Sequence, residues 1–442
     1  MRPRWALAAG TLGGAALLLA PAAGGFTVLG GALPSSAADV RVFNNFSDAT
    51  ANDNVTPDGQ FPGQTGAVLA IWKASVEWGS TLHGTGDGDP TQPGDLGSGN
   101  SNFDPAFAGL ADGIGDANDN VHSEGNLGPG ILAVTEFAGD GWRIRYNSAF
   151  QWDDGPGAPA AGTIDLQTVA TRQYGHALGL GNTSVPGCVM SAAAGAPTVR
   201  DLCPDDQAGI QFLYGLRAAT KPSIDGVLVD AAGQVSLFGS GFDSFGNEVW
   251  FSSLAPTPAD PTPTVKLLGV VSTAGGTRID VALPVSAGPG DVLVRRAGAG
   301  YAALSNAWPL DGPGGVSCGV MPYGTGLGGA NIATLTSFDA PAVGAAFELD
   351  LAGFAVDGPA LTALSTGDAA LPLFGGTVLV DPASLFAVLT TSVTGGTGVQ
   401  PIAIADQPSL AGARVFAQSA QIDAGQPAGI AFSNGVELVV CP

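Results

Sequence analysis

Apolar and polar residues follow two different patterns along this 442-residue chain, with the change near residue 221. Before that point, apolar residues recur at helical spacing in segments 66–79, 163–180 and 204–214, which we predict to be helices. In 66–79 they form one apolar stripe. Strand-like runs lie between these segments at 130–136 and 142–146. The mixture predicts an α+β domain for residues 39–215.

After residue 221 the chain alternates apolar and polar residues in short runs separated by Gly and Pro. Short strands at such spacing predict β-sandwiches, so we expect two all-β sandwich domains, at 221–311 and 317–442. Pro222 disfavours helix continuation and marks the boundary within the connector 216–222. The runs with the clearest strand pattern lie at 235–242, 249–251, 279–284, 291–294 and 436–440.

The first 23 residues have the pattern of a signal peptide. Arg2 and Arg4 precede an apolar run that ends in Ala20-Pro21-Ala22, a small-x-small cleavage pattern. The run is shorter than the ~20 residues that a spanning helix needs, and later apolar runs are broken by polar residues. We therefore expect a secreted or cell-surface protein without a membrane span, with an uncleaved anchor as the alternative.

Composition narrows the range of partners. The chain has 68 Gly and 32 Pro, and only 12% of its residues are charged, as expected for a loop-rich β protein. The net charge of −23 would repel a polyanion over most of the surface. We therefore expect no nucleic-acid partner.

The four cysteines fall into two pairs, Cys188 with Cys203 and Cys318 with Cys441. Neither pair has the spacing of a zinc finger. Because export favours oxidation, we expect both pairs to be disulfides.

The most informative segment is 172–182, Arg-Gln-Tyr-Gly-His-Ala-Leu-Gly-Leu-Gly-Asn, with Met190 downstream. It resembles the matrixin (metzincin) pattern H-E-x-x-H-x-x-G-x-x-H with its Met-turn, matching at His176, Gly179 and Met190. The resemblance extends over 39–215 and implies a metzincin-like fold. It also implies a zinc-dependent peptidase ancestry.

Three family positions are replaced. Arg172 stands at the first zinc-ligand position, Gln173 at the general-base position and Asn182 at the third ligand position. A guanidinium stays protonated and cannot bind zinc, and an amide cannot accept the proton of the attacking water. His176 is then the one imidazole left at the three ligand positions, and one imidazole plus one amide oxygen is a poor zinc site.

The favoured interpretation is a catalytically impaired or inactive homologue that retains a peptide-binding or scaffolding role, with His176 a hydrogen-bonded remnant. One alternative is an active zinc endopeptidase that recruits His83 or His122, which we expect in polar Gly/Asp loops. Another is an adhesion or assembly protein that acts through its sandwich domains.

Two acidic loops carry oxygen ligands at alternate positions, one with Asp87 and Asp89 and the other with Asp116 and Asp119. Clustered oxygens suit calcium. Because neither loop has a complete EF-hand pattern, solvated turns are the favoured interpretation and calcium the alternative.

The segment 221–311 contains Gly239-Ser-Gly-Phe242 and Pro284. A Gly-x-x-Phe turn and a Pro after a late strand recur in the IPT/TIG immunoglobulin-like family, which this segment resembles. The resemblance implies an immunoglobulin-like sandwich. The segment 317–442 indicates a sandwich but no particular chemistry.

Overall fold

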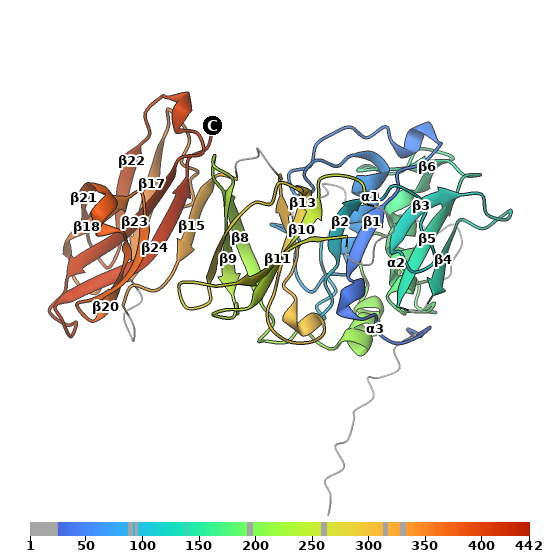
Figure 1. Cartoon of the computed structure of the whole chain (residues 1–442), viewed down its shortest axis with the longest axis horizontal. Helices are drawn as coiled ribbons and strands as arrows, with labels where there is room; N and C mark the ends of the chain where they lie inside the picture. The colour runs from blue at the N-terminus through green and yellow to red at the C-terminus, as the bar shows by residue number, and fades with distance from the viewer. Residues whose placement is uncertain are drawn as a thin grey trace, which may run out of the picture.

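The computed structural model describes residues 25–86, 92, 96–138, 140–191, 198–257, 263–312, 317–327 and 333–442. The predicted signal peptide, 1–23, lies outside these residues. Three parts follow one another along the long axis of the molecule, from the helix-containing N-terminal part to the C-terminal β-rich part (Figure 1). Among the described helices, none is long and apolar enough to cross a bilayer.

The N-terminal part is built on a five-stranded sheet in the order β2-β1-β3-β5-β4. The first four of these strands pair in parallel, and β4 is an antiparallel edge strand. Helices α1 and α2 pack on each other, α1 also contacts β1, and α2 also contacts β4 and β5. The elements are η1 (Ser35–Ala37), β1 (Asp39–Val42), η2 (Ala49–Ala51), α1 (Gly66–Val76), β2 (Ala106–Leu110), β3 (Val121–Gly125), β4 (Ala133–Ala138), β5 (Gly141–Asn147), β6 (Trp152–Asp153), β7 (Ile164–Asp165), α2 (Leu166–Ala177) and α3 (Pro204–Tyr214).

Every residue of helix α1, Gly66–Val76, is buried, including those outside the predicted apolar stripe. The sheet and α2 cover one side of the helix. On another side, the Trp72 indole Nε1 donates to Asp291 Oδ2 of the middle part, at 3.0 Å. Lys73 is buried with its ammonium 2.8 Å from Asp58 Oδ2. The middle part therefore covers part of α1.

The middle part consists of two sheets, β11-β10-β13-β14 and β12-β9-β8. Apolar residues from both sheets, such as Val235, Val249 and Val292, form one buried cluster between them. Membership of the IPT/TIG family stays a prediction. The elements are β8 (Ser223–Val229), β9 (Gln234–Ser240), β10 (Asn247–Ser253), β11 (Val265–Val270), β12 (Arg278–Ala282), β13 (Ala287–Arg295), η3 (Tyr301–Ala303) and β14 (Trp308–Leu310).

The C-terminal part combines a five-stranded sheet, β15-β24-β23-β18-β21, with β16-β17-β22 and the hairpin β19-β20. Cys318 and Cys441 form a disulfide that joins its two ends. The elements are β15 (Gly319–Tyr323), β16 (Thr334–Thr336), β17 (Ala346–Ala352), β18 (Gly358–Ser365), β19 (Asp368–Leu373), β20 (Gly376–Val380), η4 (Pro382–Ser384), β21 (Leu385–Val393), β22 (Gly398–Ala403), η5 (Pro408–Leu410), β23 (Arg414–Ile422) and β24 (Ile430–Val439).

Buried ion pairs stand at both joins between these parts. At the first join, the ammonium of Lys221 lies 2.8 Å from Asp104 Oδ2 and donates to the Tyr301 carbonyl at 2.8 Å. At the second, the guanidinium of Arg278 lies 3.0 Å from Glu437 Oε2. All four charged groups, Lys221, Asp104, Arg278 and Glu437, are almost fully buried. Each charge is costly to bury unless its partner is present.

We predict that Lys221→Ala lowers the free energy of unfolding by about 3–5 kcal/mol, because Asp104 would be left buried without its cation. Urea unfolding measures the loss. The control is Arg296→Ala, which removes a partly exposed cation 3.9 Å from Asp243 and should cost less than about 1 kcal/mol. Equal effects of the two substitutions would contradict a stabilising role for the buried pair.

Candidate functional site

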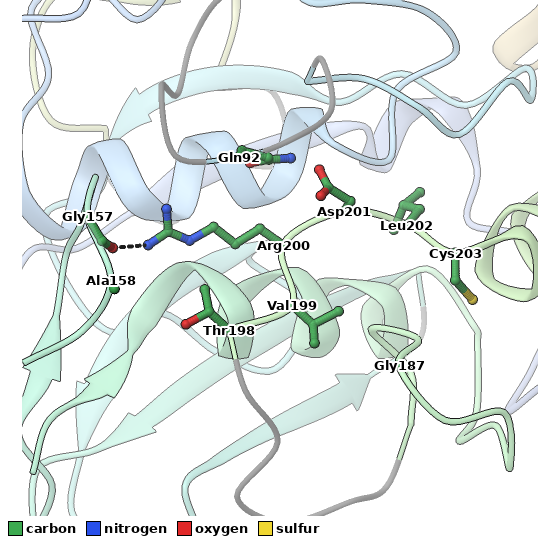
Figure 2. Close-up of a pocket in the computed structure, with 10 residues that line it drawn as sticks. All are labelled: Gln92, Gly157, Ala158, Gly187, Thr198, Val199, Arg200, Asp201, Leu202 and Cys203. Atoms are coloured by element: carbon green, nitrogen blue, oxygen red, sulfur yellow. Dashed lines mark hydrogen bonds between the residues drawn. The ribbon is translucent and has the colours of Figure 1, made fainter. Parts of the chain in front are cut away.

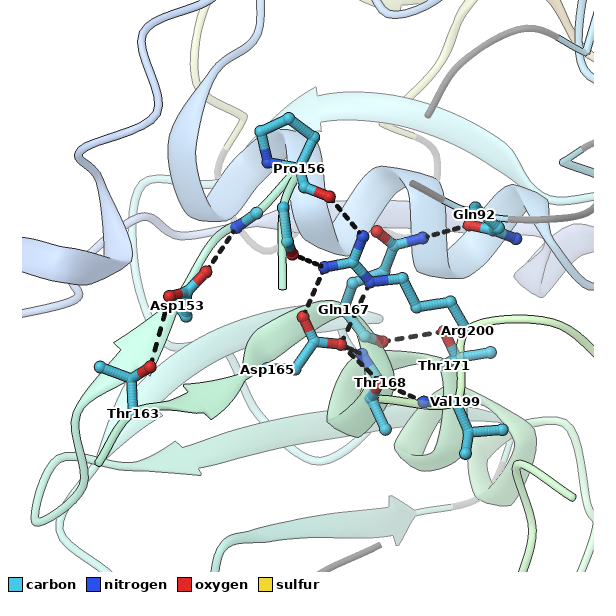
Figure 3. Close-up of polar contacts among 12 residues, drawn as sticks. Gln92, Asp153, Pro156, Thr163, Asp165, Gln167, Thr168, Thr171, Val199 and Arg200 are labelled. Carbon is cyan, nitrogen blue, oxygen red and sulfur yellow. Dashed lines mark hydrogen bonds and ion pairs between the residues drawn. The ribbon is translucent and has the colours of Figure 1, made fainter. Parts of the chain in front are cut away.

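Helix α2 begins at Leu166 because Asp165 caps it: Asp165 Oδ2 accepts from the Thr168 backbone N–H at 2.9 Å. The expected start at residue 163 is thus corrected, since Ile164–Asp165 form strand β7. A carboxylate is stabilised at a helix N-terminus by the helix dipole. The guanidinium of Arg200 adds an ion pair at 2.7 Å to Asp165 Oδ1 (Figure 3). Sequence spacing gave no sign of this partner, 35 residues away.

The chain turns sharply after α2. The helix ends at Ala177, and Gly179 has a φ of +100°, a conformation that favours glycine. The Gly179 N–H donates to the His176 carbonyl at 2.9 Å. This turn brings Asn182 back beside the helix, as the contacts of Arg172 below demonstrate.

Met190 lies beneath α2 and is 2% exposed. A Cβ at Gly175 would stand 2.5 Å from Met190 Sδ, so only glycine allows this approach of the helix. The carboxylate of Asp206, on α3, accepts from the backbone N–H groups of Val189 (2.8 Å) and Met190 (3.2 Å). The disulfide Cys188–Cys203 joins the same two segments.

Arg172 and Asn182 are in direct contact. The Arg172 guanidinium donates from Nη2 to Asn182 Oδ1 at 2.8 Å and from Nη1 to the Ser191 carbonyl at 2.6 Å. The guanidinium thereby joins α2 to the segment after the turn and to the segment that carries Met190. Burial lowers the pKa of Arg172 from its ordinary value, but a guanidinium remains charged in proteins.

His176 is a close neighbour of that charge. Its Nδ1 lies 2.8 Å from the Leu180 carbonyl, which can only accept, so Nδ1 carries the hydrogen and the lone pair of the neutral ring lies on Nε2. Burial and the positive charge of Arg172 lower the pKa of His176, against an opposing effect of the Leu180 hydrogen bond. The imidazole is therefore neutral at pH 7.

Gln173 is tied to the edge strand β4. The Thr135 hydroxyl lies 2.8 Å from Gln173 Oε1 and 2.9 Å from the Gln173 carbonyl oxygen. The side-chain oxygen thus accepts a hydrogen bond from Thr135 of the sheet. The Gln173 side chain also lines the cavity described next.

A cavity of about 710 Å³ runs beside α2. Its wall is mostly apolar, and among the described residues that line it only Asp165 and Arg172 are charged. The lining comes from the region around β4, from β7 and α2, and from the segments on either side of 192–197: Gly130, Leu132, Ala133, Phe150, Pro159, Thr163, Ile164, Asp165, Thr168, Val169, Arg172, Gln173, Cys188, Val189, Ser191, Thr198 and Val199.

A second pocket, of about 470 Å³, shares Thr198 and Val199 with this lining (Figure 2). Figure 2 shows the Arg200 side chain crossing it to reach the Gly157 carbonyl, a 3.0 Å hydrogen bond. Gln92 also borders this pocket and accepts from Gln167 of α2 at 2.9 Å. The pocket is therefore bounded by groups that hold α2 in place.

The other two histidines are engaged elsewhere. His83 is 3% exposed, and its Nε2 lies 2.7 Å from Asp291 Oδ1 of the middle part. His122 was expected in a loop, but it lies on β3, fully buried, with Nδ1 2.9 Å from the Tyr146 hydroxyl. Burial lowers the pKa of His122 to about 3, so the ring is neutral. The Gly and Asp residues that precede β3 are typical of loops, so the sequence pattern did not indicate a strand at His122.

The candidate calcium residues are only partly described. Asp87 and Asp89 lie outside the described residues. Asp116 and Asp119 belong to one turn, closed by the Asp119 N–H donating to the Asp116 carbonyl at 3.2 Å. Within the described part of the chain, the one group of three potential metal ligands is Cys188, Cys203 and Asp206, whose two sulfurs are already in a disulfide.

Comparison with known proteins agrees with this geometry. The sequence model of the matrixin family (Peptidase_M10) matches residues 113–215. This part of the chain is therefore similar to the matrixin domain, and it holds α2, the turn after it and the Met190 segment.

Three curated relatives show the extent of the likeness. Metalloendoproteinase 1-MMP of Arabidopsis thaliana is 36% identical over 104 residues, covering 23% of this chain and 28% of that protein. Matrilysin of Mus musculus is 38% identical over 95 residues (20% and 34%), and matrilysin of Rattus norvegicus is 36% identical over 126 residues (26% and 45%). The chain thus spans less than half the length of each of these relatives.

Several site residues had no signal in the sequence pattern. Thr135, Ser191 and Arg200 hold Gln173, Arg172 and the start of α2, but each is distant along the chain from its partner. Glu77 is a fourth residue without a signal in the sequence pattern. It is fully buried and accepts hydrogen bonds from the Leu202 N–H at 3.0 Å and from Ser98 Oγ at 2.5 Å. It fixes the segment that leads from the cavity to α3.

We predict that Glu77 makes the protein less stable as the pH rises. Burial raises its pKa from the ordinary 4.5 to about 7, so between these values the folded state holds more protons than the unfolded state. The free energy of unfolding should therefore fall by up to about 3 kcal/mol across this window, relative to the non-titrating Glu77→Gln.

Urea unfolding of both proteins below and above the window measures this difference. Glu348→Gln, the same substitution at an exposed strand position, serves as the control. If the difference in the free energy of unfolding between the wild-type protein and Glu77→Gln does not change with pH, the raised pKa of Glu77 is contradicted.

Proposed function

We propose that this chain is a secreted, matrixin-like metallopeptidase homologue that does not hold a catalytic zinc and retains its cleft for binding peptide. The observation that carries the proposal is the hydrogen bond of Arg172 to Asn182. Two positions that would supply metal ligands in the family pattern instead form a contact with each other.

The donor set argues against zinc. Catalytic zinc takes three protein ligands, usually imidazole, thiolate or carboxylate. His176 offers one imidazole nitrogen, whereas Asn182 Oδ1 already accepts from Arg172, whose positive charge would repel a cation. Gln173 has no basic group to take a proton from water. Neither metal binding nor the hydrolytic step is supported by these groups.

Recruitment of another histidine is also disfavoured. His83 is paired with Asp291 and His122 with Tyr146, both in buried surroundings. Moving either ring would leave a buried polar partner unsatisfied, at a cost of about 1–3 kcal/mol. The active-enzyme alternative therefore requires a rearrangement of the core.

Peptide binding is supported by the shape and position of the cavity. A volume of about 710 Å³ suits a small ligand or a few side chains. β4 borders the helix at the edge of the five-stranded sheet. An edge strand presents unpaired backbone groups, to which an extended peptide can pair.

Export is supported by the signal-like pattern of residues 1–23 and by the two disulfides. Disulfides persist in oxidising compartments. We therefore place the protein outside the cytoplasm, in the medium or at the cell surface.

The test is reversion of the three replaced positions. After dialysis, elemental analysis should find no stoichiometric zinc in the wild-type chain and about one zinc per chain in the Arg172→His/Gln173→Glu/Asn182→His variant. The turn at Gly179 and the neutral His176 provide the geometry for this gain.

Adding His176→Ala to the triple variant is the matched control and should abolish the gained zinc. Tightly bound zinc in the wild-type chain, together with chelator-sensitive cleavage of casein, would refute the inactive assignment. If the triple variant folds correctly but binds no zinc, positions 172, 176 and 182 do not meet in the geometry that a zinc site needs.

A further inference from the structure

Among the described residues, the guanidinium of Arg172, which borders the large cavity, has no carboxylate partner. Its two hydrogen bonds go to neutral oxygens, Asn182 Oδ1 and the Ser191 carbonyl. No carboxylate of the described residues lies within ion-pair distance of it. Asp165, the other charged residue of the lining, is already paired with Arg200 at 2.7 Å.

Among the described residues, four almost fully buried cations differ from Arg172 in this respect. Lys73, Arg200, Lys221 and Arg278 each face a carboxylate at 3.0 Å or less. The chain has 38 acidic residues and 15 Lys and Arg, so a carboxylate partner is easily available. An unpaired guanidinium within so acidic a protein therefore indicates a site that an external anion can complete.

The geometry of Arg172 suits recognition of a carboxylate. A guanidinium has five N–H groups, and the two hydrogen bonds above use two of them. Because one bond goes to the Ser191 backbone carbonyl and the other to the Asn182 side chain, the group is held in one orientation before a ligand arrives, which reduces the entropic cost of binding. The remaining N–H groups match the paired oxygens of a carboxylate.

The apolar residues of the cavity determine which side chain of the ligand would fit beside its carboxylate. Besides Arg172, the lining includes Val169, Val189, Leu132 and Phe150. Such a wall favours an apolar side chain placed one residue or less from the charge. A peptide that ends in an apolar residue with a free carboxyl group carries both features.

We propose that the cavity beside α2 binds peptide carboxylates, and that the C-terminal carboxylate of an apolar residue accepts hydrogen bonds from Arg172. This inference rests on the peptide-binding role proposed above and adds the ligand class to it. The position that supplies a metal ligand in the family pattern becomes an anion anchor.

The experiment compares three fluorescein-labelled pentapeptides by fluorescence anisotropy. One ends in leucine with a free carboxylate, the second ends in leucinamide, and the third ends in leucinamide with an internal glutamate. The free carboxylate should bind the wild-type chain about ten- to a hundredfold more tightly than the amide, as expected for a charge-assisted hydrogen-bonded pair. Only a weak gain is expected from the glutamate, whose carboxylate is displaced from the apolar wall.

Two variants assign the effect. Arg172→Gln should bring the ratio of free-acid affinity to amide affinity close to one, and Arg296→Gln, at a partly exposed cation of the middle part, should leave that ratio at its wild-type value. Circular dichroism checks that each variant is folded.

Equal binding of the free acid and the amide would overturn the carboxylate anchor and leave the peptide-binding role standing. Equal gains from glutamate and the C-terminus would overturn the C-terminal assignment. Failure of all three peptides to bind would overturn both this inference and the peptide-binding role.

Discussion

Lys221 and Arg278 are buried where neighbouring parts of the chain meet, and each pairs with a buried carboxylate, Asp104 and Glu437 respectively. A charge taken out of water is costly unless its partner is in place, so each join is stable in the arrangement that brings both charges together. With 15 Lys and Arg against 38 Asp and Glu, cations are scarce in this chain. Their positions therefore govern how the three parts fit to one another.

The same constraint gives Arg172 its significance. Its charge is held by neutral oxygens at the edge of an apolar cavity, where a carboxylate partner is missing among the described residues. The guanidinium joins α2 to the Met190 segment and to the segment that carries Asn182, and the family pattern would join α2 to the latter through a metal ion. A cation at a ligand position of the family pattern thus changes the chemistry of the site.

Much of the local structure could be predicted from periodicity and turn chemistry. The helix expected at 204–214 is α3 (Pro204–Tyr214), because Pro204 and the acidic residues after it suit a helix start. The strand around 142–146 is β5 (Gly141–Asn147). The predicted start of α2 was wrong, because Arg200, distant in the sequence, supports the cap at Asp165. The prediction of a loop around His122 was also wrong, because parallel pairing with β1 and β5 stabilises strand β3 there.

The sequence by itself determined the matrixin-like spacing of His176, Gly179 and Met190, and the chemical types that replace the ligands and the base. These depend on neighbours a few residues apart, for which helix geometry and side-chain chemistry are sufficient. Only the tertiary structure decided that Arg172 contacts Asn182 and Ser191, that Glu77 is buried, and that the middle part covers α1. Those contacts join segments far apart in the chain, and their stability depends on which groups become buried together.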